Sequence, residues 1–408
     1  MTSHRLFTLI TLVILFTLTA VSAFAQDEDL TELDRPLFMA HYMPWYQTPD
    51  VSGSWGWHWT MDHFNPASGE IASHFTPLTG AYDSQDEAIL EYQMALMKLS
   101  GIDGVIVDWY GPDDFNDYAV INASTLKLFD VIKRAGMHFI ICYEDRTLIP
   151  MIDQGYVTDH TAVEHGAEVI QYIQDTWFTD PAYVKFNGQP LLFSYGPLYY
   201  RDSNQWEEMF AGIEPTPLLV TLDNYLSFGA ASSFPWPPMH LSAGIELPQQ
   251  SLDDYLQRFY RNARRRDFVV GTAFPGFFDI YEEAGVRTSY GYIDAKDGET
   301  FRYTLDLALQ ADASIIQLAT WNDYGEGTTI EPTEEYGYQY LEMLQETRSD
   351  LDANFTATPN DLRLPMQLLN ARRARVGDDE ANAQLDEAFA SLVSGDTNTA
   401  QSVLATFE

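Results

Sequence analysis

The sequence predicts an α/β fold, a (β/α)8 TIM barrel followed by a C-terminal helical extension. From about residue 37 to about residue 348, short apolar runs alternate with longer amphipathic segments. This alternation is typical of a parallel sheet covered by helices, and about eight such pairs over roughly 310 residues suit a closed barrel. Polar or aromatic residues follow nearly every run, which places a reactive face at the carboxyl ends of the strands.

An open doubly wound sheet is the alternative architecture. Such a sheet binds its ligand at one switch point, commonly through a glycine-rich phosphate loop of the form GxGxxG or GxxxxGK. Neither pattern follows an apolar run in this sequence, and the polar residues are spread over many strand ends. The barrel is therefore favoured.

Each apolar run has the length of a strand, and each amphipathic segment repeats its apolar residues every three or four positions. The expected strands are residues 37–42, 104–108, 137–142, 190–194, 218–222, 244–247, 268–273 and 314–319. The expected helices are residues 85–99, 124–135, 162–177, 204–210, 251–265, 298–310 and 334–348. Residues 47–80 lack a helical period but hold several Trp and His side chains, so we expect this loop to form one wall of a cleft.

The N-terminus carries the signals of an exported protein. His4 and Arg5 precede an apolar run over residues 6–21, and residues 23–25 (AFA) have the small-x-small pattern that signal peptidases cut. We expect residues 1–25 to be a signal peptide, cleaved after Ala25. The mature protein would then be secreted or periplasmic, with no membrane attachment.

The C-terminus changes in character after the last expected barrel helix. Residues 26–355 are expected to form the catalytic barrel and residues 356–408 a helical hairpin. Leu385, Phe389 and Leu392 would share one face of its first helix. This hairpin packs on the barrel or offers a surface to a partner.

Composition excludes several classes of function. The 408 residues carry a formal charge of -38, whereas nucleic acids and anionic membranes are bound by clustered Lys and Arg. A neutral glycan remains compatible with this charge, and the oligomeric state stays open. Cys142 is the single cysteine, so an intramolecular disulfide and a cysteine metal cluster are excluded, and we expect it to be a small buried residue.

Residues 320–331 contain the candidate catalytic groups. Asp323 and Glu326 lie directly after the last expected strand, among glycines that allow a sharp bend. Two neighbouring carboxyls beside apolar walls can differ in pKa, so that one is protonated and one ionised near neutral pH. Trp321 and Tyr324 favour a sugar site over a solvated turn. We therefore predict Asp323 and Glu326 to be a catalytic acid and base.

Further candidates lie at the other strand ends and in the loops that follow. Aromatic rings can stack on sugar faces, and polar groups can bind sugar hydroxyls, although each acidic residue could equally cap a helix. The substrate-binding candidates are His41, Tyr42, Trp45, Tyr46, Trp57, His58, Asp108, Trp109, Tyr143, Glu144, Tyr195, Asp223, Glu246, Asp279, Arg287, Trp321, Asn322 and Tyr324.

Two other chemistries have weaker support. His58 and His63 with Asp62 could bind a metal, and His41 at a strand end is typical of metal-dependent barrel hydrolases. Those enzymes need a second His two residues later, where Met43 stands here. The GxSxG turn of serine hydrolases is absent from the sequence. We expect neither a metal nor another cofactor.

These residues together resemble glycoside hydrolase families 71 and 99, over about residues 36 to 345. The resemblance rests on residues 41–46 (HYMPWY) with 57–59 (WHW), on residues 274–279 (FPGFFD) with Arg287, and above all on residues 321–332 (WNDYGEGTTIEP). The relatives include endo-α-mannosidases and α-1,3-glucanases on (β/α)8 barrels. The resemblance implies that Glu326 is the general acid, and that Asp323 is the base, acting on water or on the sugar's own 2-hydroxyl.

The motif leaves the choice between the two families open. Asp323, Tyr324 and Gly325 stand where family 99 usually has Glu-Trp-His, which leans toward family 71, whereas the GTxIEP tail leans toward family 99. The implied function is hydrolysis of an α-mannan or α-glucan during polysaccharide degradation. A carbohydrate-binding barrel without turnover is the competing class, and the presence of both acids favours an enzyme. An interaction scaffold that uses the terminal helices is a third class.

Overall fold

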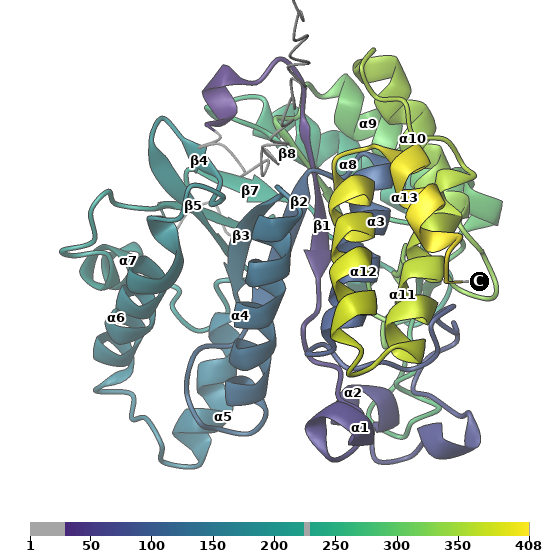
Figure 1. The fold of residues 1–408 in the computed structure, drawn as a ribbon. Coiled ribbons are helices and arrows are strands. Elements are labelled where there is room, and N and C mark those ends of the chain that lie inside the picture. The colour runs from purple at the N-terminus through teal and green to yellow at the C-terminus, as the bar shows by residue number, and fades with distance from the viewer. Residues whose placement is uncertain (1–28, 224–228, 408) are drawn as a thin grey trace, which may run out of the picture.

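The computed structural model describes residues 29–223 and 229–407, so the expected signal peptide lies outside the described residues (Figure 1). Eight parallel strands form a nearly closed barrel in the order β7-β6-β5-β3-β2-β1-β11-β8, which confirms the predicted fold class. The barrel strands are β1 (Leu37–Tyr42), β2 (Gly104–Trp109), β3 (His138–Tyr143), β5 (Gln189–Ser194), β6 (Leu218–Leu222), β7 (Ser232–Phe234), β8 (Val270–Ala273) and β11 (Ile315–Leu318). Outside the barrel, β4 (Lys185–Phe186) pairs antiparallel with β5, and β9 (Phe277–Phe278) pairs with β10 (Tyr292–Ile293).

The prediction of a strand at residues 244–247 is wrong. This segment is irregular, and its contact with β10 is an isolated bridge between Glu246 and Tyr292. Ala243 and Gly244 have φ angles of 54° and 80°, which an extended strand does not adopt. The barrel strand in this part of the chain is β7, whose two serines and following proline make a weak apolar signal.

Side chains help to close the barrel where β7 meets β8. The Ser232 hydroxyl donates to the Phe268 carbonyl at 2.9 Å, and the Thr272 hydroxyl donates to the Pro235 carbonyl at 2.8 Å. Pro235 has no N–H to offer a neighbouring strand, so a backbone ladder cannot continue through it. These two side-chain bonds join β7 to β8.

Helices cover the outside of the barrel, and further helices follow at the C-terminus (Figure 1). The helices are α1 (Pro49–Ser52), α2 (Trp57–Thr60), α3 (Glu87–Ser100), α4 (Tyr118–Arg134), α5 (Leu148–Asp153), α6 (Ala162–Ile173), α7 (Ser203–Met209), α8 (Gln249–Ala263), α9 (Glu299–Gln310), α10 (Gln339–Leu351), α11 (Leu364–Ala374), α12 (Asp379–Val393) and α13 (Thr397–Leu404). The sequence analysis did not anticipate α11, which packs with α12 against α3. No helix of the described residues has the length and apolarity needed to cross a membrane.

Strand alternation divides the apolar side chains of the barrel strands between two clusters. Met39, Ile106 and Ile140 belong to the cluster inside the barrel, whereas their neighbours Phe38 and Val105 belong to the larger one between barrel and helices. Successive side chains of a strand point to opposite faces, so residues two apart share a face. This rule decides which residue at each strand end reaches the interior.

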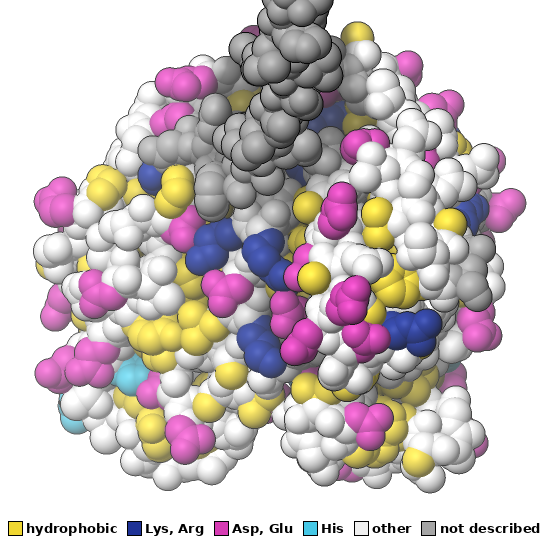
Figure 2. Space-filling model, viewed as in Figure 1, with side chains coloured by type: hydrophobic (Ala, Val, Ile, Leu, Met, Phe, Trp, Pro, Cys, Tyr) yellow, Lys and Arg dark blue, Asp and Glu magenta, His cyan; other side chains and the backbone are white. Residues whose placement is uncertain are grey.

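Acidic side chains dominate the surface. The sequence has 60 Asp and Glu against 22 Lys and Arg. Figure 2 shows Asp and Glu scattered over the face in view, with Lys and Arg in a few groups. Some of those cations pair with acids, as Arg134 does with Glu87 at 2.8 Å.

Candidate active site

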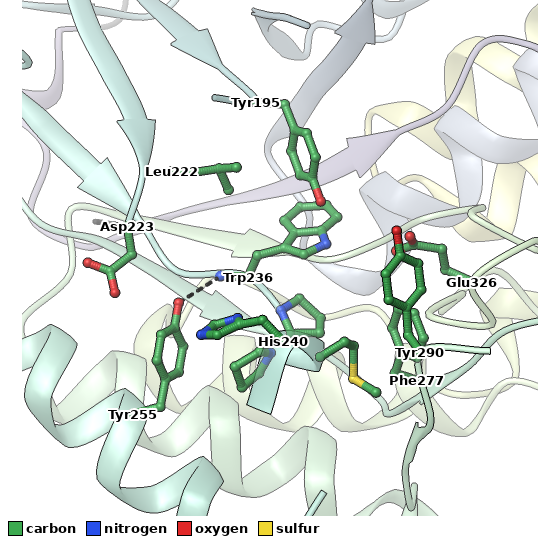
Figure 3. Close-up of a pocket in the computed structure, with 12 residues that line it drawn as sticks. Tyr195, Leu222, Asp223, Trp236, His240, Tyr255, Phe277, Tyr290 and Glu326 are labelled. Carbon is green, nitrogen blue, oxygen red and sulfur yellow. Dashed lines mark hydrogen bonds between the residues drawn. The ribbon is translucent and has the colours of Figure 1, made fainter. Parts of the chain in front are cut away.

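A cleft with two lobes opens over the carboxyl ends of the barrel strands. The first lobe is a cavity of about 300 Å³ and the second a cavity of about 430 Å³. The first lobe is lined by His41, Met43, Trp45, Trp57, His58, Met61, Asp108, Tyr110, Glu144, Arg146, Tyr195, Trp236, Tyr281, Val286, Arg287, Tyr290, Asp323, Gly325 and Glu326. The second lobe is lined by Tyr195, Leu222, Asp223, Trp236, Pro237, Pro238, Met239, His240, Tyr255, Phe277, Tyr290 and Glu326 (Figure 3).

Both predicted catalytic residues and many of the substrate-binding candidates line this cleft. The candidates in the first lobe are His41, Trp45, Trp57, His58, Asp108, Glu144, Tyr195, Arg287, Asp323 and Glu326. Asp223 lines the second lobe, and Tyr195 and Glu326 line both. The structure thus brings together residues from β1 through to the turn after β11.

The turn after β11 holds Asp323 and Glu326 by hydrogen bonds within the turn. The Asp323 carboxylate accepts from the Glu326 N–H at 2.9 Å, and the Asp323 N–H donates to the Thr320 hydroxyl at 2.8 Å. Gly327 has a φ of +64°, and a Cβ there would lie 2.5 Å from the Phe278 carbonyl oxygen. A side chain at position 327 would therefore displace the turn.

A buried network supports the turn from behind. Glu331 accepts from the hydroxyls of Tyr82 and Tyr324, both at 2.8 Å, and from the Gln93 amide at 2.7 Å. The Asn322 side chain accepts from the Met43 N–H at 2.8 Å and donates to the Met43 carbonyl at 3.0 Å. These bonds tie the turn to β1 and α3.

The two predicted catalytic carboxyls differ in their electrostatic surroundings. Burial raises the pKa of Asp323 to about 6, although backbone N–H groups of Glu326 and Gly325 oppose the rise. Burial, followed by the charges of Asp323, Asp279 and Glu144, raises the pKa of Glu326 well above its usual range. Because N–H donors favour the charged form of Asp323, the proton is held preferentially by Glu326.

Two further carboxyls share the first lobe. Burial raises the pKa of Glu144 to about 7, with Arg146 opposing the rise. Burial and the charges of Glu144, Asp323 and Glu326 raise the pKa of Asp108. Neighbouring carboxyls in a poorly solvated cavity cannot all ionise at neutral pH. Protonated members can donate hydrogen bonds, and ionised members can accept them.

His41 lines the first lobe and has one unprotonated ring nitrogen, which is buried. Gln317 donates its amide N–H to Thr272 at 3.3 Å, so its oxygen accepts from His41 Nδ1 at 3.0 Å. Nδ1 therefore carries the proton, and Nε2 has a free lone pair without a hydrogen-bond partner among residues 29–223 and 229–407. Burial lowers the pKa of His41 to about 4, so the ring is neutral at neutral pH.

One group of potential metal ligands occurs within residues 29–223 and 229–407. Donor atoms of His41, Asp108 and Cys142 lie within 4.8 Å of one another, and all three residues are buried. Burial raises the pKa of the Cys142 thiol, which does not favour the thiolate that metals bind. His58 and His63 with Asp62 are not part of this group, and metal independence stays a prediction.

Because side chains alternate along a strand, three of the substrate-binding candidates point away from the cleft. Tyr42, Trp109 and Tyr143 each follow an inward-facing residue and therefore point to the helices. Tyr42 donates its hydroxyl to Gln93 at 2.6 Å, and Trp109 stacks on Tyr172 with ring centroids 5.9 Å apart. These residues support the strand ends from outside.

The remaining candidates are structural or lie elsewhere. Tyr46 donates its hydroxyl to the Asn322 carbonyl at 2.7 Å. The side chains of Tyr46, Trp321, Asn322 and Tyr324 are all buried. Asp279 is buried and accepts from the Tyr290 N–H at 2.8 Å and the Ser289 hydroxyl at 3.1 Å. Glu246 is exposed and accepts from the Tyr292 hydroxyl at 2.9 Å. None of these side chains lines either lobe.

Five aromatic or charged residues that line the first lobe were missed by the sequence analysis. They are Tyr110, Arg146, Trp236, Tyr281 and Tyr290. Tyr110 lies two residues after Asp108, and Trp236 lies two residues after Phe234 of β7, so the two-residue period would have found both. Trp236 was overlooked because β7 was, and Figure 3 shows it between Asp223 and Glu326.

Comparisons with known proteins indicate one family. The model of glycosyl hydrolase family 99 matches residues 33–216, and thus the strands from β1 to β5. A glycoprotein endo-alpha-1,2-mannosidase of Mus musculus is 21% identical over 361 residues, covering 77% of this chain and 72% of the relative. A glycoprotein endo-alpha-1,2-mannosidase-like protein of Danio rerio is 22% identical over 330 residues, covering 71% and 69%.

Solved structures share the fold. The GH99 endo-alpha-mannosidase of Bacteroides thetaiotaomicron, in complex with bis-tris-propane, superposes with a TM-score of 0.56 at 22% identity, covering 77% of this chain and 98% of that one. A glycoside hydrolase-like protein superposes with a TM-score of 0.54 at 14% identity, covering 79% and 95%. At these identities the likeness shows the barrel alone.

Proposed function

Because the chain is a glycoside hydrolase of the family 99-like group, we propose that it is an endo-acting hydrolase of α-mannan. The observation that carries this proposal is the pair Asp323 and Glu326, held by one turn at the base of an open cleft. The family match ends at residue 216, so the roles of these two residues rest on the site itself. The curated relatives are endo-alpha-1,2-mannosidases, which supports mannose as the sugar.

In the proposed mechanism, Glu326 is the general acid and Asp323 the base. Glu326 keeps its proton near neutral pH because burial and three neighbouring carboxyls raise its pKa. Asp323 ionises at lower pH because two backbone N–H groups stabilise its charge. Asp323 would accept a proton from water or from the sugar's 2-hydroxyl as the glycosidic bond breaks.

The two lobes support cleavage within a chain. Glu326 lines both lobes, so open space extends from the acid in two directions. An enzyme that removes single terminal sugars needs a closed pocket on one side, whereas a cleft open on both sides accepts a longer glycan. We therefore propose endo action.

We also propose that the protein is exported. The proposal rests on the apolar run and the cleavage pattern in residues 1–25. A polysaccharide outside the cell is too large to cross the membrane, so a hydrolase of such a polymer would act outside the cytoplasm. Export would thus place the cleft where such a substrate occurs.

The test is a screen of the purified mature protein against α-mannan and α-1,3-glucan, with product chromatography. We expect oligosaccharides from α-mannan early in the reaction. Products from α-1,3-glucan alone would show that this polymer, and not α-mannan, is the substrate. Binding of either glycan without any product would instead indicate a carbohydrate-binding barrel.

A further inference from the structure

Resting on the proposed function, we infer that the chain has a second carbohydrate-binding site outside the cleft. The site is a separate cavity of about 470 Å³ beside the hairpin of β9 and β10, which we call the hairpin pocket. Its lining includes the rings of Phe75, Phe278, Tyr292, Tyr336 and Tyr340. Its ligand is a pyranose unit of the same polysaccharide that the cleft hydrolyses.

The hairpin exposes two neighbouring aromatic rings. Phe278 of β9 and Tyr292 of β10 are direct cross-strand partners, so their side chains lie on the same face of the hairpin. They are 46% and 39% exposed, whereas the preceding residue, Phe277, is buried. Adjacent exposed rings form an apolar patch, and such patches mark binding surfaces.

Other rings hold the lining of the hairpin pocket in place. His74 stacks on Phe278, with ring centroids 3.8 Å apart and an angle of 11° between the ring planes. Tyr336 packs against Phe75 and against Tyr340, with centroids 5.3 Å apart in each pair. Side chains that are already fixed lose little conformational freedom when a ligand binds.

The groups around the hairpin pocket favour a neutral ligand that is rich in hydroxyls. Asp294 lines the pocket and is exposed, and the exposed Glu246 accepts from the Tyr292 hydroxyl at 2.9 Å. Carboxylates accept hydrogen bonds from sugar hydroxyls, and their charge repels an anionic ligand such as a fatty acid. The aromatic rings can stack on the C–H faces of a pyranose. A neutral sugar uses both kinds of group.

The hairpin pocket lies directly behind the turn that carries Glu326. Gly327 and Thr329 of this turn line the pocket, and the Phe278 N–H of β9 donates to the Glu326 carbonyl at 2.9 Å. Phe277 lines both the hairpin pocket and the second lobe of the cleft, where Figure 3 shows it on the Glu326 side. A single wall therefore separates the two cavities.

This position allows two segments of one polymer to bind at the same time. A segment in the hairpin pocket keeps the rest of the chain close to the cleft and so raises its effective concentration there. A short oligosaccharide that fills the cleft alone gains nothing from the pocket. The second site therefore strengthens binding of the polymer and leaves short substrates unaffected.

The test compares α-mannan with the shortest α-mannan oligosaccharide that the parent enzyme hydrolyses. We expect Phe278→Ala and Tyr292→Ala each to raise KM for the polymer about three- to tenfold, the effect of losing one stacking contact. The value of kcat for the polymer, and both constants for the oligosaccharide, should stay within about twofold of the parent. Tyr292→Ala leaves β9 unaltered, so it decides the test alone if Phe278→Ala fails to fold.

A second measurement records binding without turnover. The same substitutions are made in the Glu326→Gln protein, and its retardation in a native gel that contains α-mannan is compared with that of Glu326→Gln alone. We expect weaker retardation when either ring is removed.

Ile245→Ala is the matched control for both measurements. Ile245 is 66% exposed and its carbonyl accepts from the Tyr292 N–H at 3.2 Å, so it lies beside the same hairpin. It lines neither the hairpin pocket nor either lobe of the cleft. This substitution should change neither the kinetic constants nor the retardation.

Three results would overturn the inference. Parental KM and parental retardation in the Tyr292→Ala protein would show that the hairpin pocket does not bind the polymer. Equal losses on the polymer and on the oligosaccharide would show that the hairpin acts through the turn at Glu326. A parent enzyme that neither hydrolyses nor binds α-mannan contradicts the proposed function and the inference together, whereas the first two results leave the proposed function intact.

Discussion

Glu144 is a carboxyl that the fold keeps partly protonated at neutral pH. Its pKa is raised to about 7, mainly by burial, so folding favours the proton-bound form. The stabilisation linked to that proton is complete below the ordinary pKa of 4.5 and is lost as the pH rises through about 7. Ionisation at higher pH therefore destabilises the protein.

We accordingly predict that Glu144→Gln stabilises the protein at pH 8 but not at pH 4.5. An uncharged amide resembles the protonated carboxyl, so the two proteins should match at the lower pH. At pH 8 the gain in the free energy of unfolding should be on the order of 1–3 kcal/mol. Thermal unfolding at both pH values measures it, and an equal effect at the two values would contradict the prediction.

His41, Asp108 and Cys142 allow a direct test of metal dependence. His41 and Asp108 line the first lobe, and burial raises the pKa of the Cys142 thiol, which keeps it protonated. We predict that dialysis against a chelator leaves hydrolysis of α-mannan unchanged. Loss of activity that a single divalent ion restores would show that these residues bind a catalytic or structural metal.

Neighbouring residues at the strand ends show which features of the site the sequence predicts and which it does not. The motif around His41 and Tyr42 correctly marked a strand end, yet only His41 faces the cleft. The two-residue period separates them, and the same period would have recovered Tyr110. By contrast, the sequence pattern does not show that Asp279 accepts hydrogen bonds within its own loop or that Glu331 supports the turn, because these bonds depend on how the loops and α3 fold together.

Among the helices, α11 attaches to the barrel through a buried ion pair. Arg372 contacts Glu91 of α3 at 2.9 Å, and Glu91 is 2% exposed. Arg134 of α4 also contacts Glu91, at 3.2 Å. Removing one cation would leave a buried carboxylate with a single partner, which is costly.

We predict that Arg372→Met lowers the free energy of unfolding by about 2–4 kcal/mol. Arg373→Met is the matched control, because Arg373 is exposed on the same helix and should cost less than about 0.5 kcal/mol. Denaturant unfolding of both variants measures the difference. Equal stabilities would show that α11 does not depend on this ion pair.

Among the strands, those with a clear apolar run were predictable from the sequence, and those without one were not. β1 and β6 begin and end at the expected residues, because each is a clear apolar run that starts directly after a proline. β7 was missed because Ser232 and Ser233 lack that signal, and its place depends on neighbouring strands. The division of the chain near residue 355 into barrel and helical extension remains a proposal.

For the whole molecule, export can be measured directly at the N-terminus of the mature protein. We predict that the secreted protein begins at Gln26, because residues 23–25 match a cleavage site after the apolar run. Intact-mass spectrometry of the secreted protein decides the matter. A chain that still begins at Met1 or Thr2 would contradict the prediction.

The whole account depends on the roles of Asp323 and Glu326, and one set of rates tests both. Asp323→Asn and Glu326→Gln are nearly isosteric, so each should unfold near the parental temperature or slightly above it, since repulsion between the carboxyls is relieved. Each should lower turnover of α-mannan by about two orders of magnitude or more.

The decisive measurement is hydrolysis by these two variants of a glycoside whose leaving group needs no protonation, such as a fluoride or an activated aryl glycoside. The account predicts that Glu326→Gln recovers much of the bond-breaking rate while Asp323→Asn stays slow. Rescue of Asp323→Asn alone would reverse the two roles. Parental rates on α-mannan for both variants would show that the turn is structural and that the catalytic groups lie elsewhere.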